Sequence, residues 1–280
     1  MNYFINNYSY IIKINYFYVI IITIRGVPML NIKKLNVAIG DKKILNDFNI
    51  DIKDGEIHAI MGPNGTGKST LSKVILGNKN YEVLSGDIKL DGKSILGLTT
   101  DEISRRGVFV SFQNPISIEG VQTSEFLKTA INARRENAIG LFEFVNEIKA
   151  KAKELDFPEE MVHRNINVGA SGGERKKNEV LQLELLEPSF IILDELDSGL
   201  DIDSLKKVSQ GINNYLKEHP KTSVLIITHY PRILEYIKPQ FVHMMVCGKI
   251  VKTGGYDLAF EIDKKGYSDT SVIGSDKEDE

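Results

Sequence analysis

Short, continuous apolar runs recur along the chain and predict buried strands. The clearest runs are residues 57–61, 107–112, 190–193 and 223–228. Runs of this length, without alternation of apolar and polar positions, are typical of strands covered on both faces of a parallel sheet. Residues 204–217 instead have the apolar spacing of an amphipathic helix. The pattern therefore predicts an α/β fold built on a parallel sheet.

Two other stretches depart from this pattern. Residues 30–52 show the patchy alternation that is typical of strands on either side of a turn. Within residues 114–165 the apolar positions follow helical spacing, and we expect helices at 123–135, at 141–155 and directly after Pro158. This segment is predicted to be a helical insertion between strands of the α/β core.

The domain organisation follows from these patterns. We expect an α/β core at residues 29–113 and 166–270, with a helical subdomain at 114–165. Residues 271–280 are charged and are predicted to be disordered. Residues 1–28 are rich in Ile, Asn and Tyr and lack acidic side chains, so we exclude them from the fold. Three alternatives remain for them: a targeting leader, an upstream extension ahead of a functional start at the next methionine, or a membrane anchor.

Composition narrows the classes of function. Of 280 residues, 42% are apolar and 26% are charged, which is typical of a globular protein with a substantial core. The net charge of −3 gives no general attraction to nucleic acid, so no nucleic-acid partner is expected. The single cysteine, Cys247, allows no intrachain disulfide and indicates a reducing compartment. It lies in a predicted apolar strand, residues 242–247, so we expect a buried thiol.

One stretch carries specific chemistry, the P-loop pattern G-x-x-x-x-G-K-S between an apolar strand and a helix. Its glycines let backbone N–H groups curl around phosphate oxygens, and the helix start adds the positive end of its dipole. The lysine reaches the β- and γ-phosphates, and the serine offers a hydroxyl to Mg²⁺. The predicted nucleotide contacts are Gly62, Pro63, Asn64, Gly65, Thr66, Gly67, Lys68, Ser69 and Thr70.

Polar residues stand at the carboxyl ends of the apolar runs. Gln113 follows one run, the pair Asp194 and Glu195 ends another, and His229 follows a third. The carboxyl ends of parallel strands share one edge of a sheet, which is where ligands bind. The sequence therefore predicts a carboxamide, two carboxylates and an imidazole beside the P-loop, around one nucleotide.

The ordered set of motifs resembles the nucleotide-binding domain of the ABC ATPase superfamily, from residue 29 to about residue 255. GPNGTGKS is similar to its Walker A loop, Gln113 to its Q-loop glutamine, and FIILDE to its Walker B motif. ASGGE at 170–174 resembles the signature motif, residues 198–201 the D-loop, and His229 the switch histidine. The resemblance implies a P-loop NTPase core with an antiparallel β subdomain and a helical subdomain.

The same resemblance implies an ATPase with ATP and Mg²⁺ as its cofactors. The residues that would hold Mg²⁺ are Ser69, Gln113 and Asp194. The implied catalytic residues are Lys68, Gln113, Glu195 and His229. Among them Glu195 would polarise the attacking water, and His229 would contact that water and the γ-phosphate.

The resemblance also implies that each ATP site is completed by a second copy. Ser171, Gly172, Gly173 and Asp201 would serve the partner's nucleotide in a transient, ATP-dependent, head-to-tail homodimer. Family members commonly stack adenine on an aromatic side chain, but Ile39 stands at that place here. We therefore expect modest ATP affinity and loose base selectivity.

Finer detail resembles one branch, the SufC family, the ATPases of the SUF iron–sulfur cluster assembly machinery. EIHAIMGPNGTGKSTL, SGGERKKNEVLQ and LDELDSGLDIDSLK carry this similarity. It implies SufB- and SufD-like scaffold proteins as partners, docked through the helical subdomain and the Gln113 loop. Two alternatives remain: the cytosolic ATPase of an ABC transporter, and a binding module in which ATP only locks a complex. Residues 175–177 form a basic run that is expected on a solvated or partner-facing surface.

The compartment depends on residues 1–28. A bacterial protein of this kind would be cytoplasmic, whereas a targeting leader would direct the chain to a plastid stroma, in an apicoplast or chloroplast. No direct membrane insertion of the folded domain is expected in either case.

Overall fold

The computed structural model describes residues 9–11, 21–23 and 29–267. The strands β1 (Ser9–Ile11) and β2 (Ile21–Thr23) pair antiparallel with each other. The three alternatives for residues 1–28 fall mostly outside the described residues. The predicted disorder of 271–280 lies outside them altogether.

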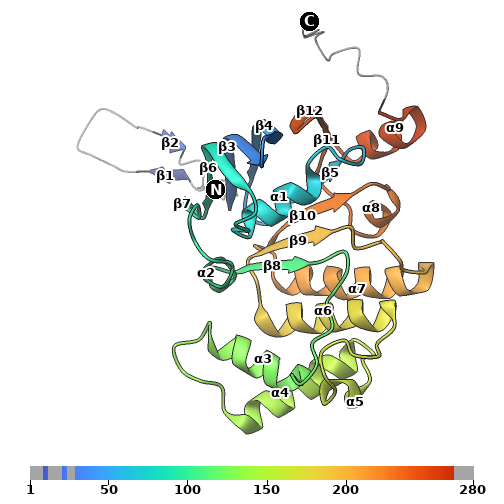
Figure 1. Cartoon of the computed structure of the whole chain (residues 1–280). Coiled ribbons are helices and arrows are strands. Elements are labelled where there is room, and N and C mark those ends of the chain that lie inside the picture. The colour runs from blue at the N-terminus through green and yellow to red at the C-terminus, as the bar shows by residue number, and fades with distance from the viewer. Residues whose placement is uncertain (1–8, 12–20, 24–28, 268–280) are drawn as a thin grey trace, which may run out of the picture.

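The main sheet contains the predicted apolar runs. Its strand order is β12-β11-β5-β10-β9-β8 (Figure 1). All neighbouring pairs from β11 to β8 are parallel, and only the edge strand β12 is antiparallel. β9 and β10 are buried along their whole length, as expected for central strands that carry no polar face. The strand bounds are β5 (Ile57–Met61), β8 (Val108–Ser111), β9 (Phe190–Asp194), β10 (Ser223–Thr228), β11 (Phe241–Val246) and β12 (Lys249–Gly254).

A second sheet is antiparallel, with the order β4-β3-β6-β7. Helix α1 (Lys68–Ile75) lies between the two sheets (Figure 1). Leu71 and Ile75 of this helix share one apolar cluster with Phe48 of the second sheet and Ile60 of the first. The strands are β3 (Leu30–Ile39), β4 (Lys42–Ile52), β6 (Glu82–Leu90) and β7 (Lys93–Ser94). The sequence-based fold class, an α/β core with an antiparallel β subdomain, is thus confirmed.

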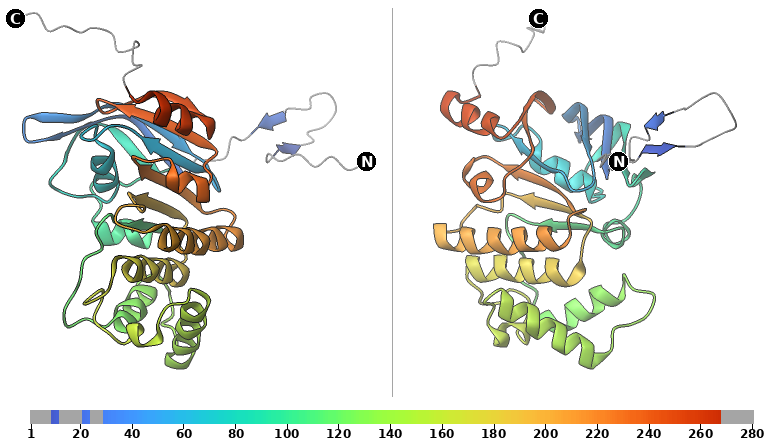
Figure 2. Two further views of the ribbon diagram at one scale, coloured as in Figure 1. Left: turned by 90° about the vertical axis from the view of Figure 1, so that its right-hand side faces the viewer. Right: turned by 180° about the vertical axis from the view of Figure 1, so that it is seen from behind.

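One set of helices packs on the other face of the main sheet. A second set packs on the first set rather than on the sheet. A second apolar cluster joins β9 and β10 to α6, α7, α8 and α9. A third cluster joins α3, α4 and α5 to the opposite side of α6, away from the antiparallel sheet (Figure 2). The helices are α2 (Thr100–Arg105), α3 (Thr123–Asn132), α4 (Leu141–Glu154), α5 (Glu159–Val162), α6 (Gly172–Leu186), α7 (Ile202–Glu218), α8 (Arg232–Tyr236) and α9 (Asp257–Lys265). None of the helices in the described part of the chain has the length and apolar content that a membrane crossing requires.

The expected burial of Cys247 is wrong. β11 ends at Val246, and Cys247 and Gly248 form the turn to β12, where the cysteine side chain is exposed. Both turn residues have positive φ, 46° and 75°, as a two-residue hairpin turn of type I′ requires. A Cβ at Gly248 would lie 2.2 Å from the Ile44 carbonyl oxygen, so the turn packs tightly against β4.

Candidate functional site

The P-loop connects β5 to α1 at the carboxyl edge of the main sheet. All nine predicted nucleotide contacts from Gly62 to Thr70 lie in this loop and the first turn of α1. Gly67 precedes the helix with a φ of +99°, a conformation open to glycine but strained for other residues. A Cβ at Gly62 would lie 2.2 Å from the Met245 carbonyl oxygen. The glycines are thus needed both for the loop's curvature and for its close packing.

Lys68 is held inside this loop. Its Nζ donates hydrogen bonds to the carbonyl oxygens of Gly62 at 2.7 Å and Pro63 at 2.8 Å. Burial lowers the pKa of Lys68 to about 8, while the charges of Glu195 and Asp194 act in the opposite direction. The ammonium group is therefore held inside the loop by the loop's own carbonyl oxygens.

Asp194 ends β9 next to α1. Its Oδ2 accepts a hydrogen bond from Ser72 Oγ at 2.6 Å. Among the described residues, nothing donates to its buried Oδ1. Burial raises the pKa of Asp194, and the Ser72 hydrogen bond opposes this shift. A buried carboxylate oxygen without a donor, close to the start of α1 that carries Ser69, fits the oxygen ligands that Mg²⁺ prefers.

Glu195, His229 and Gln113 form one connected group beside the P-loop. Glu195 Oε1 lies 2.7 Å from His229 Nε2, and Glu195 Oε2 accepts a hydrogen bond from the Gln113 side chain. His229 Nδ1 in turn lies 3.1 Å from the Gly62 carbonyl oxygen. The ends of three strands therefore converge on the loop that holds Lys68. A crevice of about 550 Å³ opens beside Glu195 and His229.

The signature residues lie elsewhere. Ser171 caps the N-terminus of α6, accepting a hydrogen bond from Glu174 N at 3.3 Å. Gly173 and Ser171 line a small hollow of about 200 Å³ with Ser204. Asp201 caps α7 on the same side, accepting from Ser204 N at 2.8 Å. Within residues 29–267, none of Ser171, Gly172, Gly173 and Asp201 is hydrogen-bonded to the P-loop group.

Ile39 ends β3 and is 43% exposed. The hairpin that it begins leads into Leu45, whose side chain would lie 2.9 Å from a Cβ at Gly67. The buried Leu45 thus packs against the phosphate loop from beneath. The role of Ile39 towards adenine stays a prediction.

Two residues near the site were missed or misread in the sequence. Ser72 lies one helical turn after Lys68, so its place on the same face of α1 could have indicated its contact with Asp194. Lys176 was expected on a surface with the basic run 175–177, but its exposure is only 2%. It pairs with Glu179, Nζ to Oε2 at 2.9 Å. Only the tertiary packing of α6 against β8 determines this burial.

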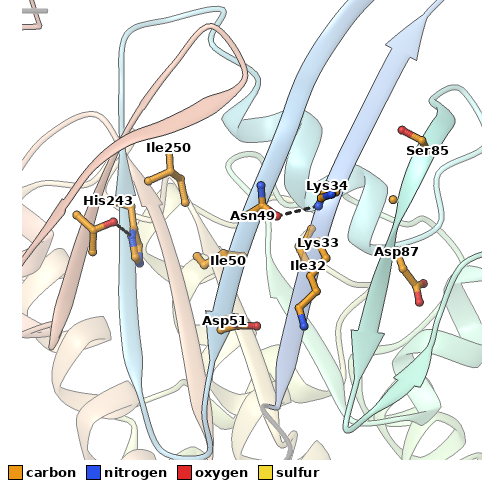
Figure 3. Close-up of a pocket in the computed structure, with 12 residues that line it drawn as sticks. Ile32, Lys33, Lys34, Asn49, Ile50, Asp51, Ser85, Asp87, His243 and Ile250 are labelled. Atoms are coloured by element: carbon orange, nitrogen blue, oxygen red, sulfur yellow. Dashed lines mark hydrogen bonds between the residues drawn. The ribbon is translucent and has the colours of Figure 1, made fainter. Parts of the chain in front are cut away.

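A larger groove, of about 700 Å³, lies away from these residues (Figure 3). It runs between the antiparallel sheet and β11, with His243 on one side and Ser85 and Asp87 on the other (Figure 3). None of the predicted site residues lines it.

The functional site lies instead at one edge of the parallel sheet, where the P-loop, the buried Asp194 and the Glu195 group meet. This arrangement defines a P-loop ATPase of the ABC class.

Comparisons with known proteins agree with this class. The family described as "ABC transporter" matches residues 45–198. "Vegetative protein 296" of Bacillus subtilis (strain 168) is 50% identical over 240 residues, 85% of this chain and 91% of that protein. "Probable ATP-dependent transporter SufC" of Escherichia coli (strain K12) is 46% identical over 243 residues, 85% of this chain and 97% of that protein.

Among solved structures, the dimeric ATP-binding cassette MJ0796, in a post-hydrolysis state with ADP and Pi, matches with a TM-score of 0.70. It is 21% identical, and the match covers 81% of this chain and 99% of the cassette, which supports the fold alone. The chain belongs to the ABC transporter family and, within it, to the SufC proteins. It is an ATPase that binds ATP and converts it with water to ADP and phosphate.

Proposed function

We propose that this chain is the ATPase subunit of an iron–sulfur cluster assembly scaffold of the SufB–SufC–SufD kind. The observation that carries the catalytic part is the contact of Glu195 with both His229 and Gln113 beside the P-loop. The likeness to SufC over most of both chains supports the choice of scaffold over a membrane permease.

In the proposed mechanism the P-loop amides and Lys68 bind the β- and γ-phosphates and offset the charge that develops during transfer. Ser69, Gln113 and Asp194 would hold Mg²⁺, which would supply positive charge to offset that of the phosphates. Glu195 orients the attacking water and accepts its proton, and the crevice beside it gives water access. His229 holds Glu195 in place through Nε2, and its Nδ1 lies beside the Gly62 carbonyl oxygen of the P-loop.

We further propose that two copies associate head to tail around ATP. The exposed signature at the start of α6 and the neighbouring Asp201 are separate from the chain's own P-loop, which suits residues that act on a second copy's nucleotide. The similar cassette MJ0796 is itself dimeric. Binding of ATP would thus close two heads and hydrolysis would separate them. This motion would deform the scaffold on which the heads are docked.

Affinity purification of the tagged chain from its native cells, followed by mass spectrometry, tests the partner. Soluble SufB- and SufD-like proteins are expected in the eluate. A membrane permease without them would contradict the proposal and favour the transporter alternative. Sequencing the N-terminus of the same sample distinguishes the alternatives for residues 1–28.

A further inference from the structure

A buried ion pair lies directly behind the Gln113 loop. Glu179, on α6, is 6% exposed. Its Oε2 accepts from Ser111 Oγ at 2.7 Å and from Lys176 Nζ at 2.9 Å, and its Oε1 accepts from the Phe112 backbone N–H at 3.1 Å. Lys176 Nζ also donates to the Phe112 carbonyl oxygen and lies 3.3 Å from Ser111 Oγ. Both charged side chains therefore hold the same short stretch of backbone.

This backbone stretch, residues 111–112, directly precedes Gln113 of the proposed catalytic group. Ser111 ends β8, Phe112 follows, and the next residue is Gln113, whose side chain donates to Glu195. Past Ser111 the chain has left the sheet, so the ladder with β9 no longer fixes it. The Phe112 N–H and carbonyl groups are held instead by two side chains of α6.

A role in stability alone does not account for this arrangement. A buried ion pair contributes little net stability, because desolvation offsets the attraction, although loss of one partner is costly. Burial raises the pKa of Glu179 even though Lys176 and the hydrogen bonds oppose the shift. An apolar pair would fill this place at lower cost, but it could not accept the Phe112 N–H. The charged pair of Lys176 and Glu179 is instead explained by its hydrogen bonds to the Phe112 backbone.

We propose that Glu179 is a positioning residue for Gln113: by accepting the Phe112 N–H it sets the place from which Gln113 reaches Glu195. The inference rests on the catalytic roles proposed above and adds to them a residue that does not touch the nucleotide. It also makes the position of Gln113 depend on α6, the helix that begins with the signature.

Paired variants separate positioning from folding. K176M/E179L replaces the ion pair with apolar side chains and leaves the Phe112 N–H without an acceptor, while K176M/E179Q restores an acceptor without charge. We expect kcat to fall by about tenfold in the first, since misplacing a catalytic group by about 1 Å costs up to about a hundredfold. The second should recover most of this loss, and ATP affinity should change less than kcat in both.

Amide hydrogen exchange at Phe112 gives a readout besides turnover. Exchange should be faster in K176M/E179L and slow again in K176M/E179Q. If kcat stays at the wild-type value in K176M/E179L, or stays low in K176M/E179Q although Phe112 is protected, the positioning role is wrong. Should K176M/E179L fail to fold, E179D retains the charge but withdraws the carboxylate from Phe112. Unchanged turnover in E179D would then overturn the inference.

A double-mutant cycle with Q113A separates this inference from the function on which it rests. If Glu179 acts through Gln113, the combination of Q113A with K176M/E179L should be no slower than Q113A alone. Additive losses would reject the positioning role but leave the catalytic assignment intact. If Q113A itself hydrolyses ATP at the wild-type rate, the proposed role of Gln113 is wrong.

Discussion

Glu195 is the first residue after β9, and its backbone has a φ of +49°. Such a conformation is uncommon for a residue with a side chain and costs on the order of 1 kcal/mol. The backbone N–H of Glu195 still donates to the Ile227 carbonyl oxygen of β10 at 2.8 Å. The chain therefore turns abruptly at this residue while the sheet holds it. This turn aims the carboxylate at His229 and Gln113.

The first prediction concerns that carboxylate. Replacing it by an amide, Glu195→Gln, keeps the shape of the side chain but removes the group that accepts a proton. We expect kcat to fall by about 10²- to 10⁴-fold with ATP binding retained, measured by phosphate release and by calorimetry. Glu235 lines the same crevice and is exposed, so Glu235→Gln serves as a matched control that should leave turnover unchanged. Normal turnover in Glu195→Gln would refute the assignment.

A second residue-scale prediction concerns two buried histidines, of which His243 lines the groove of Figure 3. His58 Nδ1 lies 2.9 Å from His243 Nε2, and the chain of contacts continues to Glu56 at one end and Thr253 at the other. Burial, with the nearby His58, lowers the pKa of His243 to about 4. Burial also lowers the pKa of His58, against the effect of Glu56.

The unfolded chain would bind more protons than the folded one between pH 6.5 and about 4, because an unfolded histidine titrates near 6.5. The free energy of unfolding should therefore fall as the pH falls through this window, by about 1–3 kcal/mol for His243. Urea unfolding at several pH values measures it. His243→Gln should flatten the dependence, while His163→Gln, an exposed histidine, should not. Equal slopes in the wild type and His243→Gln would contradict the argument.

At the scale of elements, the sequence predicted the parallel strands well because their burial on both faces leaves continuous apolar runs. Asp194 and His229 could be placed because each directly follows such a run. Lys176 and Cys247 were misplaced for the opposite reason. The burial of Lys176 depends on how α6 lies against β8, and the exposure of Cys247 on where the hairpin turns. The spacing of apolar and polar residues along the chain predicts neither the burial of Lys176 nor the exposure of Cys247.

The start of α6 carries the third prediction. Ser171→Arg places a long cation on the exposed signature and should prevent ATP-dependent association of two copies. Light scattering with and without ATP measures this, and calorimetry should still show ATP binding to the single copy. Ser171→Thr keeps the hydroxyl that caps α6 and should still associate. Dimerisation of Ser171→Arg at the wild-type level would contradict the head-to-tail arrangement.

At the scale of the whole molecule, α6 joins two apolar clusters. Val180 and Leu183 pack with the main sheet and α7, while Leu181 and Leu185 pack with α3 and α4. The apolar core of α3, α4 and α5 is therefore completed by α6, a helix that also packs on the main sheet. The boundary expected at residues 165 and 166 divides the chain, but the packing on α6 is continuous across it.

The fourth prediction tests this close packing. A Cβ at Gly211 of α7 would lie 2.8 Å from Val180 Cγ1 and 3.1 Å from Leu155 Cδ2. Gly211→Ala should therefore lower the free energy of unfolding by about 1–2 kcal/mol, because overpacking outweighs the gain of about 1 kcal/mol in helix propensity. Gln210→Ala, at an exposed neighbouring position, is the control. If Gly211→Ala alone were stabilising, the contact would be looser than described.

The turn at Cys247 and Gly248 offers a practical consequence. Gly248 N donates to the Thr66 carbonyl oxygen at 3.1 Å, so the chain's single thiol lies one residue away from a backbone contact with the P-loop. A fluorescent dye attached to Cys247 would need no engineered cysteine and no removal of others. Its emission could then follow nucleotide arrival and departure in real time, in the isolated head or within its complex.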